Sequence, residues 1–323
     1  MTDPHDLLAI DAELTAEERA LRDTVGRFLD DRVRPHVASW WAEGRLPREI
    51  AGELGRLGLL GMHLAGYGCA GAGAVAYGVA CRELEACDSG LRSLVSVQGS
   101  LAMTAIHRHG TEEQKQRWLP GMATGELIGC FGLTEPDAGS DPAGMRTRAR
   151  RDGPDWIIDG TKMWITNGGI ADVAVVWART DDGVRGFAVP TDVRGFSTRP
   201  VGEKLSLRAS ITSELLLEGC RLPEETQLPG ARGLGAPLAC LNEARYGIIW
   251  GAVGAARDCF LTALRYSKER VQFDRPIAGF QLTQAKLAAM AVDLSTSALL
   301  AQHLGRLKEA GTLRPEQVSL GKL

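Results

Sequence analysis

The chain has 323 residues, of which 44% are hydrophobic and 24% charged, and its formal net charge is −3. This is the composition of an ordinary globular protein of two or three domains, and it gives no reason to expect a nucleic acid or an anionic membrane as partner. No run of 18 consecutive apolar residues occurs, so we expect no membrane span. The seven cysteines show no CxxC pair and no metal-ligand spacing, and the N-terminus lacks the features of a signal or transit peptide. We therefore expect reduced thiols, no metal site and a cytoplasmic location.

Helical periodicity dominates the first 128 residues. Thr15 and Glu18 form a capping box, and apolar residues then repeat at helical spacing as far as Pro35, which should kink or end the helix. A helix opened by Thr111 should stop at Pro120. Glycine-rich residues 66–73 lack the spacing of a phosphate loop, so we interpret them as a connector. Further helices are expected over 47–60, 77–86 and 91–109.

From Gly129 the pattern changes to short β-prone runs separated by turn residues. The runs are 146–150, 156–158, 163–166, 173–178, 186–189 and 214–218. Asp159-Gly160 is among the expected turns, and 223–237 is expected to be a loop. These features predict an antiparallel β sandwich or barrel.

Helical periodicity returns at Leu238 and continues to about Arg270, then over 281–310. A last helix opens at Pro315 and shows no stop signal before Leu323, so we expect the native chain to continue further. The predicted fold class is a multi-domain α+β protein. Its expected parts are an all-α domain over 1–128, a β domain over 129–236 and an incomplete helical domain over 237–323.

Three stretches carry the chemical information. Gly129-Cys-Phe-Gly-Leu-Thr-Glu-Pro-Asp-Ala-Gly-Ser-Asp141 runs from a β-prone half into a Pro- and Gly-rich half with free backbone N–H groups, as an anion or a flat polar ring would require. Alone it could be any strand-to-turn corner. The second stretch, Gly160-Thr-Lys-Met-Trp-Ile-Thr-Asn-Gly168, offers an aromatic face and hydroxyls. The third is Ser267–Phe273 with Phe280–Leu287. In this order the three resemble the signatures of the acyl-CoA dehydrogenase family.

That resemblance implies a fold of helices, β unit and helical bundle, bound FAD, and a homotetramer. It implies that Phe131 to Ser140 line the flavin, with Leu133 and Thr134 bonding its ring. Trp164 would stack near the ring beside Ile165, Thr166 would bond near N5, and Ser140 would face the acyl-CoA. Arg270 would pair with a flavin phosphate of a neighbouring subunit, and Gln281 would help to hold the adenine half. Taken singly, Trp164 could instead be a core aromatic and Arg270 a member of a surface ion pair.

Arg92 is the most informative residue for the substrate. At helical spacing Ser89, Arg92, Ser96 and Ser100 form one polar stripe. A buried arginine needs an anion, which could be Glu85 or Asp88 in a structural ion pair, or a substrate carboxylate held bidentately.

The segment Leu91-Arg92-Ser93 with Ser96 and Glu85 resembles the one with which glutaryl-CoA-oxidising members of the family hold the distal carboxylate. The segment Cys240-Leu-Asn-Glu-Ala-Arg-Tyr-Gly247 also matches the family. The resemblance implies that Leu238, Asn242 and Arg245 contact the acyl-CoA.

The implied reaction is FAD-dependent oxidation of glutaryl-CoA at its α and β carbons, with decarboxylation to crotonyl-CoA and CO2. Electrons would pass to an electron-transfer flavoprotein. The alternatives are a dehydrogenase for another acyl-CoA, a non-catalytic flavin or acyl-CoA binding protein, and a flavin monooxygenase.

The family's catalytic glutamate lies in a Tyr-Glu-Gly-Thr motif that is absent here. The alternative position for it is Ala244, and Glu243 would point about 100° away on a helix. We therefore assign no catalytic base within the chain and expect it beyond Leu323.

Overall fold

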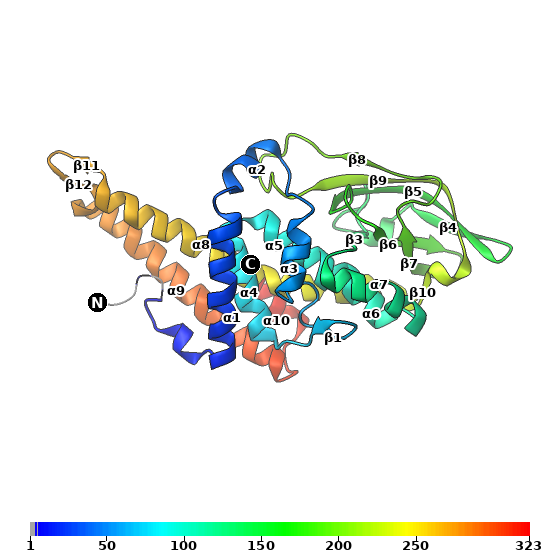
Figure 1. Ribbon diagram of the computed structural model, residues 1–323, viewed down its shortest axis with the longest axis horizontal. Helices are drawn as coiled ribbons and strands as arrows, with labels where there is room; N and C mark the ends of the chain where they lie inside the picture. The colour runs from blue at the N-terminus through cyan, green and yellow to red at the C-terminus, as the bar shows by residue number, and fades with distance from the viewer. Residues whose placement is uncertain (1–3, 5) are drawn as a thin grey trace. The chain divides into compact units, whose positions relative to one another are not determined.

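The computed structural model describes residue 4 and residues 6–323 (Figure 1). The chain divides into two compact units. Unit 1 comprises the residues up to His36, Gly73–Ser89 and Arg245–Leu323, and unit 2 comprises Val37–Ala72 and Gly90–Ala244. The domain bounds expected from the sequence follow the order of the chain, whereas these units are each assembled from separated segments.

Unit 1 is helical. Helix α4 (Ala74–Cys87) packs against α1 (Ala16–Phe28) and α9 (Gln281–Glu309), and α10 (Pro315–Lys322) packs against α9. The predicted capping box is confirmed, because Thr15 Oγ1 accepts the N–H of Glu18 and the Thr15 N–H donates to Glu18. The remaining elements are η1 (Ile10–Glu13), the π-helix η2 (Leu29–Val33), most of α8 (Gly235–Glu269), the hairpin β11 (Val271–Gln272) and β12 (Arg275–Pro276), and η6 (Ile277–Gly279).

The helices of unit 2 are broken more often than the sequence predicts. The stretch expected as one helix over 91–109 is α5 (Ser89–Ser96), the π-helix η3 (Val97–Met103) and α6 (Thr104–His109). The predicted stop at Pro120 is wrong, since α7 (Glu112–Thr124) continues to Gly125, whose φ is 78°. Burial of Leu119 and Met122 holds α7 together past the proline. The other elements are α2 (Val37–Glu43), α3 (Ile50–Arg56), β1 (Ala65–Gly66) and β2 (Cys69–Ala70).

An eight-stranded sheet forms the rest of unit 2, with strand order β10-β7-β6-β4-β5-β9-β8 and β3 beside β6 (Figure 1). The sheet is mainly antiparallel, as predicted, but β3 and β4 both pair with β6 in parallel. The strands are β3 (Gly129–Gly132), β4 (Arg148–Asp152), β5 (Asp155–Thr166), β6 (Val173–Thr180), β7 (Gly183–Pro190), β8 (Phe196–Pro200), β9 (Thr212–Leu222) and β10 (Gln227–Arg232). Short 3-10 turns η4 (Pro142–Gly144) and η5 (Glu224–Thr226) connect them.

Two sequence predictions about the sheet are wrong. Asp159-Gly160 is not a turn, because β5 continues through it with Gly160 at a φ of 151°. Any Cβ at Gly160 would overlap Thr147, so the glycine serves close strand packing rather than a reversal of the chain. The expected loop over 223–237 contains β10, which pairs with β7.

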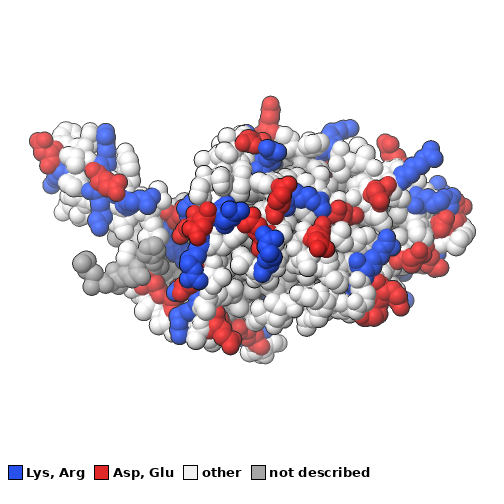
Figure 2. Space-filling model, viewed as in Figure 1, with Lys and Arg blue, Asp and Glu red and all other residues white. Residues whose placement is uncertain are grey.

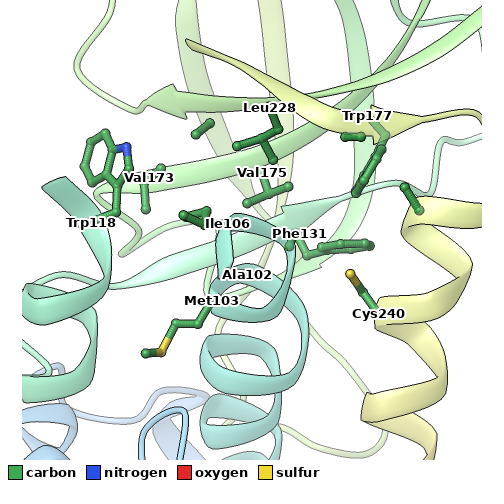
Figure 3. Packing of buried hydrophobic residues seen from close by; sticks show 14 of the residues in the cluster. Ala102, Met103, Ile106, Trp118, Phe131, Val173, Val175, Trp177, Leu228 and Cys240 are labelled. Atoms are coloured by element: carbon green, nitrogen blue, oxygen red, sulfur yellow. The ribbon is translucent and has the colours of Figure 1, made fainter. Parts of the chain in front are cut away.

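Strand β6 lies between two hydrophobic clusters. Val173, Val175 and Trp177 face the first cluster, and the alternate residues Ala174 and Val176 face the second. Figure 3 shows the first cluster, in which Ile106 from α6, Trp118 from α7 and Cys240 from α8 surround the β6 side chains. This period of two buries β6 on both faces and makes it the anchor for β3, the strand that leads into the candidate site. With the helices of unit 1 and the helices and sheet of unit 2, the predicted α+β fold class is confirmed.

Helices α8 and α9 are long and apolar enough, by length and composition alone, to cross a membrane. Their most hydrophobic windows have a mean hydropathy of 1.2 each and are 39% and 22% buried. Core helices of a bundle pass the same test. On the face seen in Figure 2, basic and acidic side chains are interspersed and no broad patch of one sign forms.

Candidate active site

The candidate site lies where β3 ends beside β5. The N–H of Met163 on β5 donates to the carbonyl of Thr134 at 2.8 Å, which ties the residues after β3 to that strand. The chain then turns tightly, because Glu135 and Ala138 exchange backbone hydrogen bonds of 3.1 and 3.2 Å. After the turn the chain comes back to the sheet as strand β4, which pairs with β6. The segment 133–147 is thus a loop anchored at both ends on the sheet.

Trp164 lies in a β-bulge opposite β9. Lys162 pairs with Leu215 and Ile165 with Ser213, so β5 holds one more residue than β9 over this stretch. Trp164 has a φ of 63°, which is unusual and costly for a bulky residue. Its side chain is 57% exposed, so the interpretation as a core aromatic is wrong. Bulges beside functional sites serve to redirect a side chain, and here the indole is directed out of the core.

A pocket of about 370 Å³ adjoins this bulge. It brings together Ser93, Trp164 and Thr166, all predicted site residues that are far apart in the sequence. The rest of its lining is Lys204, Leu205, Ser206, Leu207, Ser210 and Thr212. Hydroxyl groups and one exposed aromatic face in one pocket suit a flat, polar ring system.

Lys204 fixes the loop that forms the other side of the pocket. Its ammonium donates to the carbonyls of Leu207 and Ser210 and to the hydroxyl of Thr212. Burial lowers the pKa of Lys204 from its ordinary value. Leu205 is almost fully exposed and Leu207 is 43% exposed, so the loop presents apolar side chains at the rim of the pocket. This loop was not among the candidate site residues predicted from the sequence.

Beneath the bulge lies a buried ion pair that sequence reasoning also missed. Lys162 is fully buried, and its Nζ donates to Glu135 Oε1 at 2.8 Å and to the carbonyl of Leu133 at 3.2 Å. Burial lowers the pKa of Lys162 to about 8. Burial alone would raise the pKa of Glu135, but hydrogen bonds, above all from Lys162, leave it below its ordinary value. The available signal was a lysine inside a β-prone stretch, two residues before Trp164.

Helix α5 carries the predicted substrate residues. Arg92 is 8% exposed and Ser96 is 3% exposed, while Ser93 reaches the pocket. Arg92 takes part in a polar or electrostatic interaction, so it is not an unpaired buried charge. The predicted stripe does not extend regularly to Ser100, because α5 ends at Ser96 and the π-helix η3 changes the spacing. π-Helical segments are frequent at functional sites.

Several predicted flavin contacts are buried away from the pocket. Phe131 packs on Trp177 at a ring distance of 5.8 Å in the first hydrophobic cluster, which also includes Leu133. Ile165 belongs to the second cluster. Any contact of these three with a ring would therefore come from their backbone. Thr134 is half-buried and Ser140 is exposed on the loop after β3.

The remaining predicted residues lie on α4, on or directly after α8, or at the start of α9. Glu85 on α4 is half-buried, as are Asn242 and Arg245 on α8. Leu238, near the start of α8, is 39% exposed. Arg270, directly after α8, and Gln281, at the start of α9, are exposed.

Glu243 is engaged by a cation. Arg108 donates to its carboxylate at 2.7 Å, and the neighbouring Ala244 is buried. None of the residues that line the pocket is a carboxylate. Among the described residues, no three His, Cys, Asp or Glu side chains are grouped to hold a metal ion. We therefore assign neither a catalytic base nor a metal site among them.

Three family models match the chain in order. They are the N-terminal, middle and C-terminal domains of acyl-CoA dehydrogenase, over residues 15–126, 130–220 and 231–323. The short-chain specific acyl-CoA dehydrogenase of Clostridium acetobutylicum is 37% identical over 94% of this chain and 82% of its own length.

Solved structures agree with the family match. A glutaryl-CoA dehydrogenase from Mycobacterium smegmatis has 67% identity and a TM-score of 0.98, over 99% of this chain and 83% of that one. A second structure from Mycobacterium smegmatis, a glutaryl-CoA dehydrogenase in complex with FADH2, has 61% identity and the same TM-score and coverage. The family resemblance of the three signature stretches is thereby confirmed. The chain belongs to the acyl-CoA dehydrogenase family.

Proposed function

We propose that this protein is an FAD-dependent dehydrogenase that oxidises glutaryl-CoA. The observation that carries the proposal is the burial of the Arg92 guanidinium on α5. Arg92 does not itself line the pocket, but the same helix carries Ser93, which lines it with Trp164 and Thr166. A simple acyl chain carries no distal negative charge that could pair with a buried arginine at this position. The high identity to glutaryl-CoA dehydrogenases supports the same substrate.

The residues of the pocket fit a flavin. Trp164 offers an exposed aromatic side chain and Thr166 a hydroxyl. Thr134, half-buried on the loop after β3, does not line the pocket but is proposed to bond the ring. When bound, the flavin supplies a hydride acceptor for the β-hydrogen of the thioester substrate. The bulge at Trp164 fixes the backbone that carries the indole before any ligand arrives, which reduces the entropy lost on binding. In this proposal the backbone of Phe131, Leu133 and Ile165 frames the ring.

Arg92 would hold the distal carboxylate of the substrate. A guanidinium binds a carboxylate through two parallel hydrogen bonds, and a buried site strengthens them. Ser93 and Ser96 supply hydroxyls on the same helix. Glu85 on α4 is proposed as a further residue for substrate binding. Ser140, Leu238, Asn242 and Arg245 are proposed to contact the rest of the acyl-CoA.

Loss of the distal carboxylate as CO2 and transfer of electrons to an electron-transfer flavoprotein are parts of the same proposal. So are a cytoplasmic location and a homotetramer in which Arg270 and Gln281 reach the flavin of a neighbouring subunit. Both residues are exposed, as such a contact requires.

A second candidate is the oxidation of short unbranched acyl-CoA, which the 37% identity to a short-chain specific enzyme favours. Titrating the FAD-loaded protein anaerobically with glutaryl-CoA and with butyryl-CoA separates the two. Tighter binding of glutaryl-CoA, seen as a shift of the flavin bands at lower concentration, supports the first candidate. Tighter binding of butyryl-CoA supports the second.

A further inference from the structure

The buried pair of Lys162 and Glu135 lies directly behind the residues proposed to bond the flavin. Lys162 is 0% exposed and Glu135 is 5% exposed. Burying two charges is costly, and an apolar pair of similar size is often equally stable. Stability alone therefore does not account for an ion pair at this place.

Its hydrogen bonds instead fix the course of the backbone. Lys162 Nζ holds the carbonyl of Leu133 at 3.2 Å, and the next residue, Thr134, is held through its carbonyl by the N–H of Met163 at 2.8 Å. A Cβ on Gly132 would lie 3.2 Å from Lys162 Cγ, so the lysine stem also packs closely on the end of β3. Three successive residues are thus positioned by β5.

Glu135 controls the other end of the loop. Its carboxylate accepts the N–H of Arg146 at 2.6 Å and that of Thr147 at 3.0 Å, where the chain returns to the sheet. The pair therefore joins both ends of the loop to β5, two residues before the bulge at Trp164. Neither side chain lines the pocket itself.

We propose that Lys162 and Glu135 are positioning residues, which set the backbone of Leu133 and Thr134 and the bulge at Trp164 in the geometry that receives the flavin ring. This inference rests on the proposed function. The pair acts through these neighbours and does not touch the reacting atoms.

The test is the double variant K162M/E135Q, measured for its FAD dissociation constant, its flavin absorption bands, the midpoint potential of the bound flavin and its urea midpoint. Methionine keeps the length of the stem, glutamine keeps one acceptor oxygen for the two N–H groups, and no unpaired charge is buried. We expect a urea midpoint close to that of the wild type. FAD binding should weaken by roughly tenfold or more, which is the loss of affinity typical when a residue that orients metal ligands is replaced. The absorption bands and the midpoint potential of the bound flavin should shift as well.

A matched control lies at the other end of β3. Asp172 accepts the N–H of Ile128 at 2.7 Å and pairs with Arg48 at 2.7 Å, so R48M/D172N loosens the start of the same strand. We expect this variant to keep the FAD affinity and flavin bands of the wild type. Equal loss of FAD binding in both variants would show a general loosening of β3 and would overturn the proposal.

Unchanged FAD affinity, bands and potential in K162M/E135Q would also overturn it. Where that variant fails to fold, Lys162→Arg carries the test, because it keeps a charge for Glu135 but displaces the Leu133 carbonyl. Folded protein with weakened FAD binding then supports the proposal, and unchanged binding overturns it.

The single variants Thr134→Val and Trp164→Ala show whether the residues proposed to contact the flavin ring are assigned correctly. If both leave FAD binding unchanged, the proposed placement of the flavin fails, and the positioning proposal falls with it.

Discussion

Met163 and Thr134 are 29 residues apart in the chain, yet the N–H of Met163 donates to the carbonyl of Thr134 at 2.8 Å. Together with the bonds from Lys162 to Leu133 and Glu135, this bond joins the two motifs of the candidate site. One residue further along β5, Trp164 leaves the regular strand geometry with a φ of 63°. The site is therefore built where β3 ends and β5 bulges, with the Lys204–Ser210 loop forming the other side of the pocket.

The exposed Trp164 should matter for FAD but not for folding. Trp164→Ala should leave the free energy of unfolding within about 0.5 kcal/mol of the wild type, because its ring is 57% exposed. FAD should bind roughly three- to tenfold more weakly, since a lost aromatic pair is worth about 0.5–1.5 kcal/mol. Fluorescence titration with FAD and urea denaturation measure the two effects. Trp177→Ala, which empties a fully buried position, should instead cost about 3–5 kcal/mol of stability.

The buried carboxylate of Glu135 should make stability depend on pH in acid. Its pKa is lowered in the folded protein, so the folded state holds the ionised form more tightly than the unfolded state does. The resulting stability is fully present above the ordinary pKa of 4.5 and is lost as the pH falls through the lower folded value. Glu135→Gln lacks this contribution. The gap in urea midpoint between wild type and Glu135→Gln should therefore narrow as the pH falls below 4.5, and a constant gap would contradict this prediction.

Two glycines in helices of unit 1 should respond in opposite directions to alanine. A Cβ at Gly254 on α8 would overlap the carbonyl of Arg82 on α4, which is backbone and cannot move aside. Gly254→Ala should destabilise the protein by about 1–3 kcal/mol. Gly26 on α1 has nothing within 4 Å of its added Cβ, so Gly26→Ala should stabilise by about 0.5–1 kcal/mol. Thermal denaturation measures both, and equal effects would contradict the close packing of α4 and α8.

Gln98 in unit 2 is expected to be costly to replace. It is 1% exposed, donates to the carbonyls of Met122 and Leu127 at 2.9 and 2.8 Å, and accepts the N–H of Gly129 at 2.7 Å. Gln98→Ala leaves these groups buried without partners, so it should cost about 3 kcal/mol or more. Gln116→Ala removes one exposed bond to Glu112 and should change stability by at most about 0.5 kcal/mol. Urea denaturation of the two variants tests this contrast.

Local signals in the sequence predicted the helix starts well. The capping boxes at Thr15 and Thr111 depend on residues three positions apart, and both form in the structure. Pro120 misled the prediction, because packing of the surrounding apolar side chains holds α7 past the proline. Gly160 misled it as well, because a glycine needed for close packing against Thr147 resembles a turn glycine in the sequence.

The site was predictable only in part. The family signatures indicated Trp164, Thr166 and Ser93, which the structure brings to one pocket. The bulge at Trp164 depends on how β5 pairs with β9, and the Lys162–Glu135 bond depends on β3 lying beside β5. Neither pairing has a local sequence signal, so the geometry that places the site came only from the folded structure.

The central claim is that Arg92 selects a substrate with a distal carboxylate. The most direct measurement is the anaerobic titration of FAD-loaded wild type, Arg92→Ala and Arg92→Lys with glutaryl-CoA and butyryl-CoA, followed through the flavin bands. Losing one partner of a buried charge pair costs about 2–5 kcal/mol, so Arg92→Ala should weaken glutaryl-CoA binding by roughly 30-fold or more. Arg92→Lys should recover only part of this loss, because an ammonium lacks the bidentate geometry. Butyryl-CoA binding should stay unchanged in both variants, and equal weakening for the two ligands, or none, would contradict the claim.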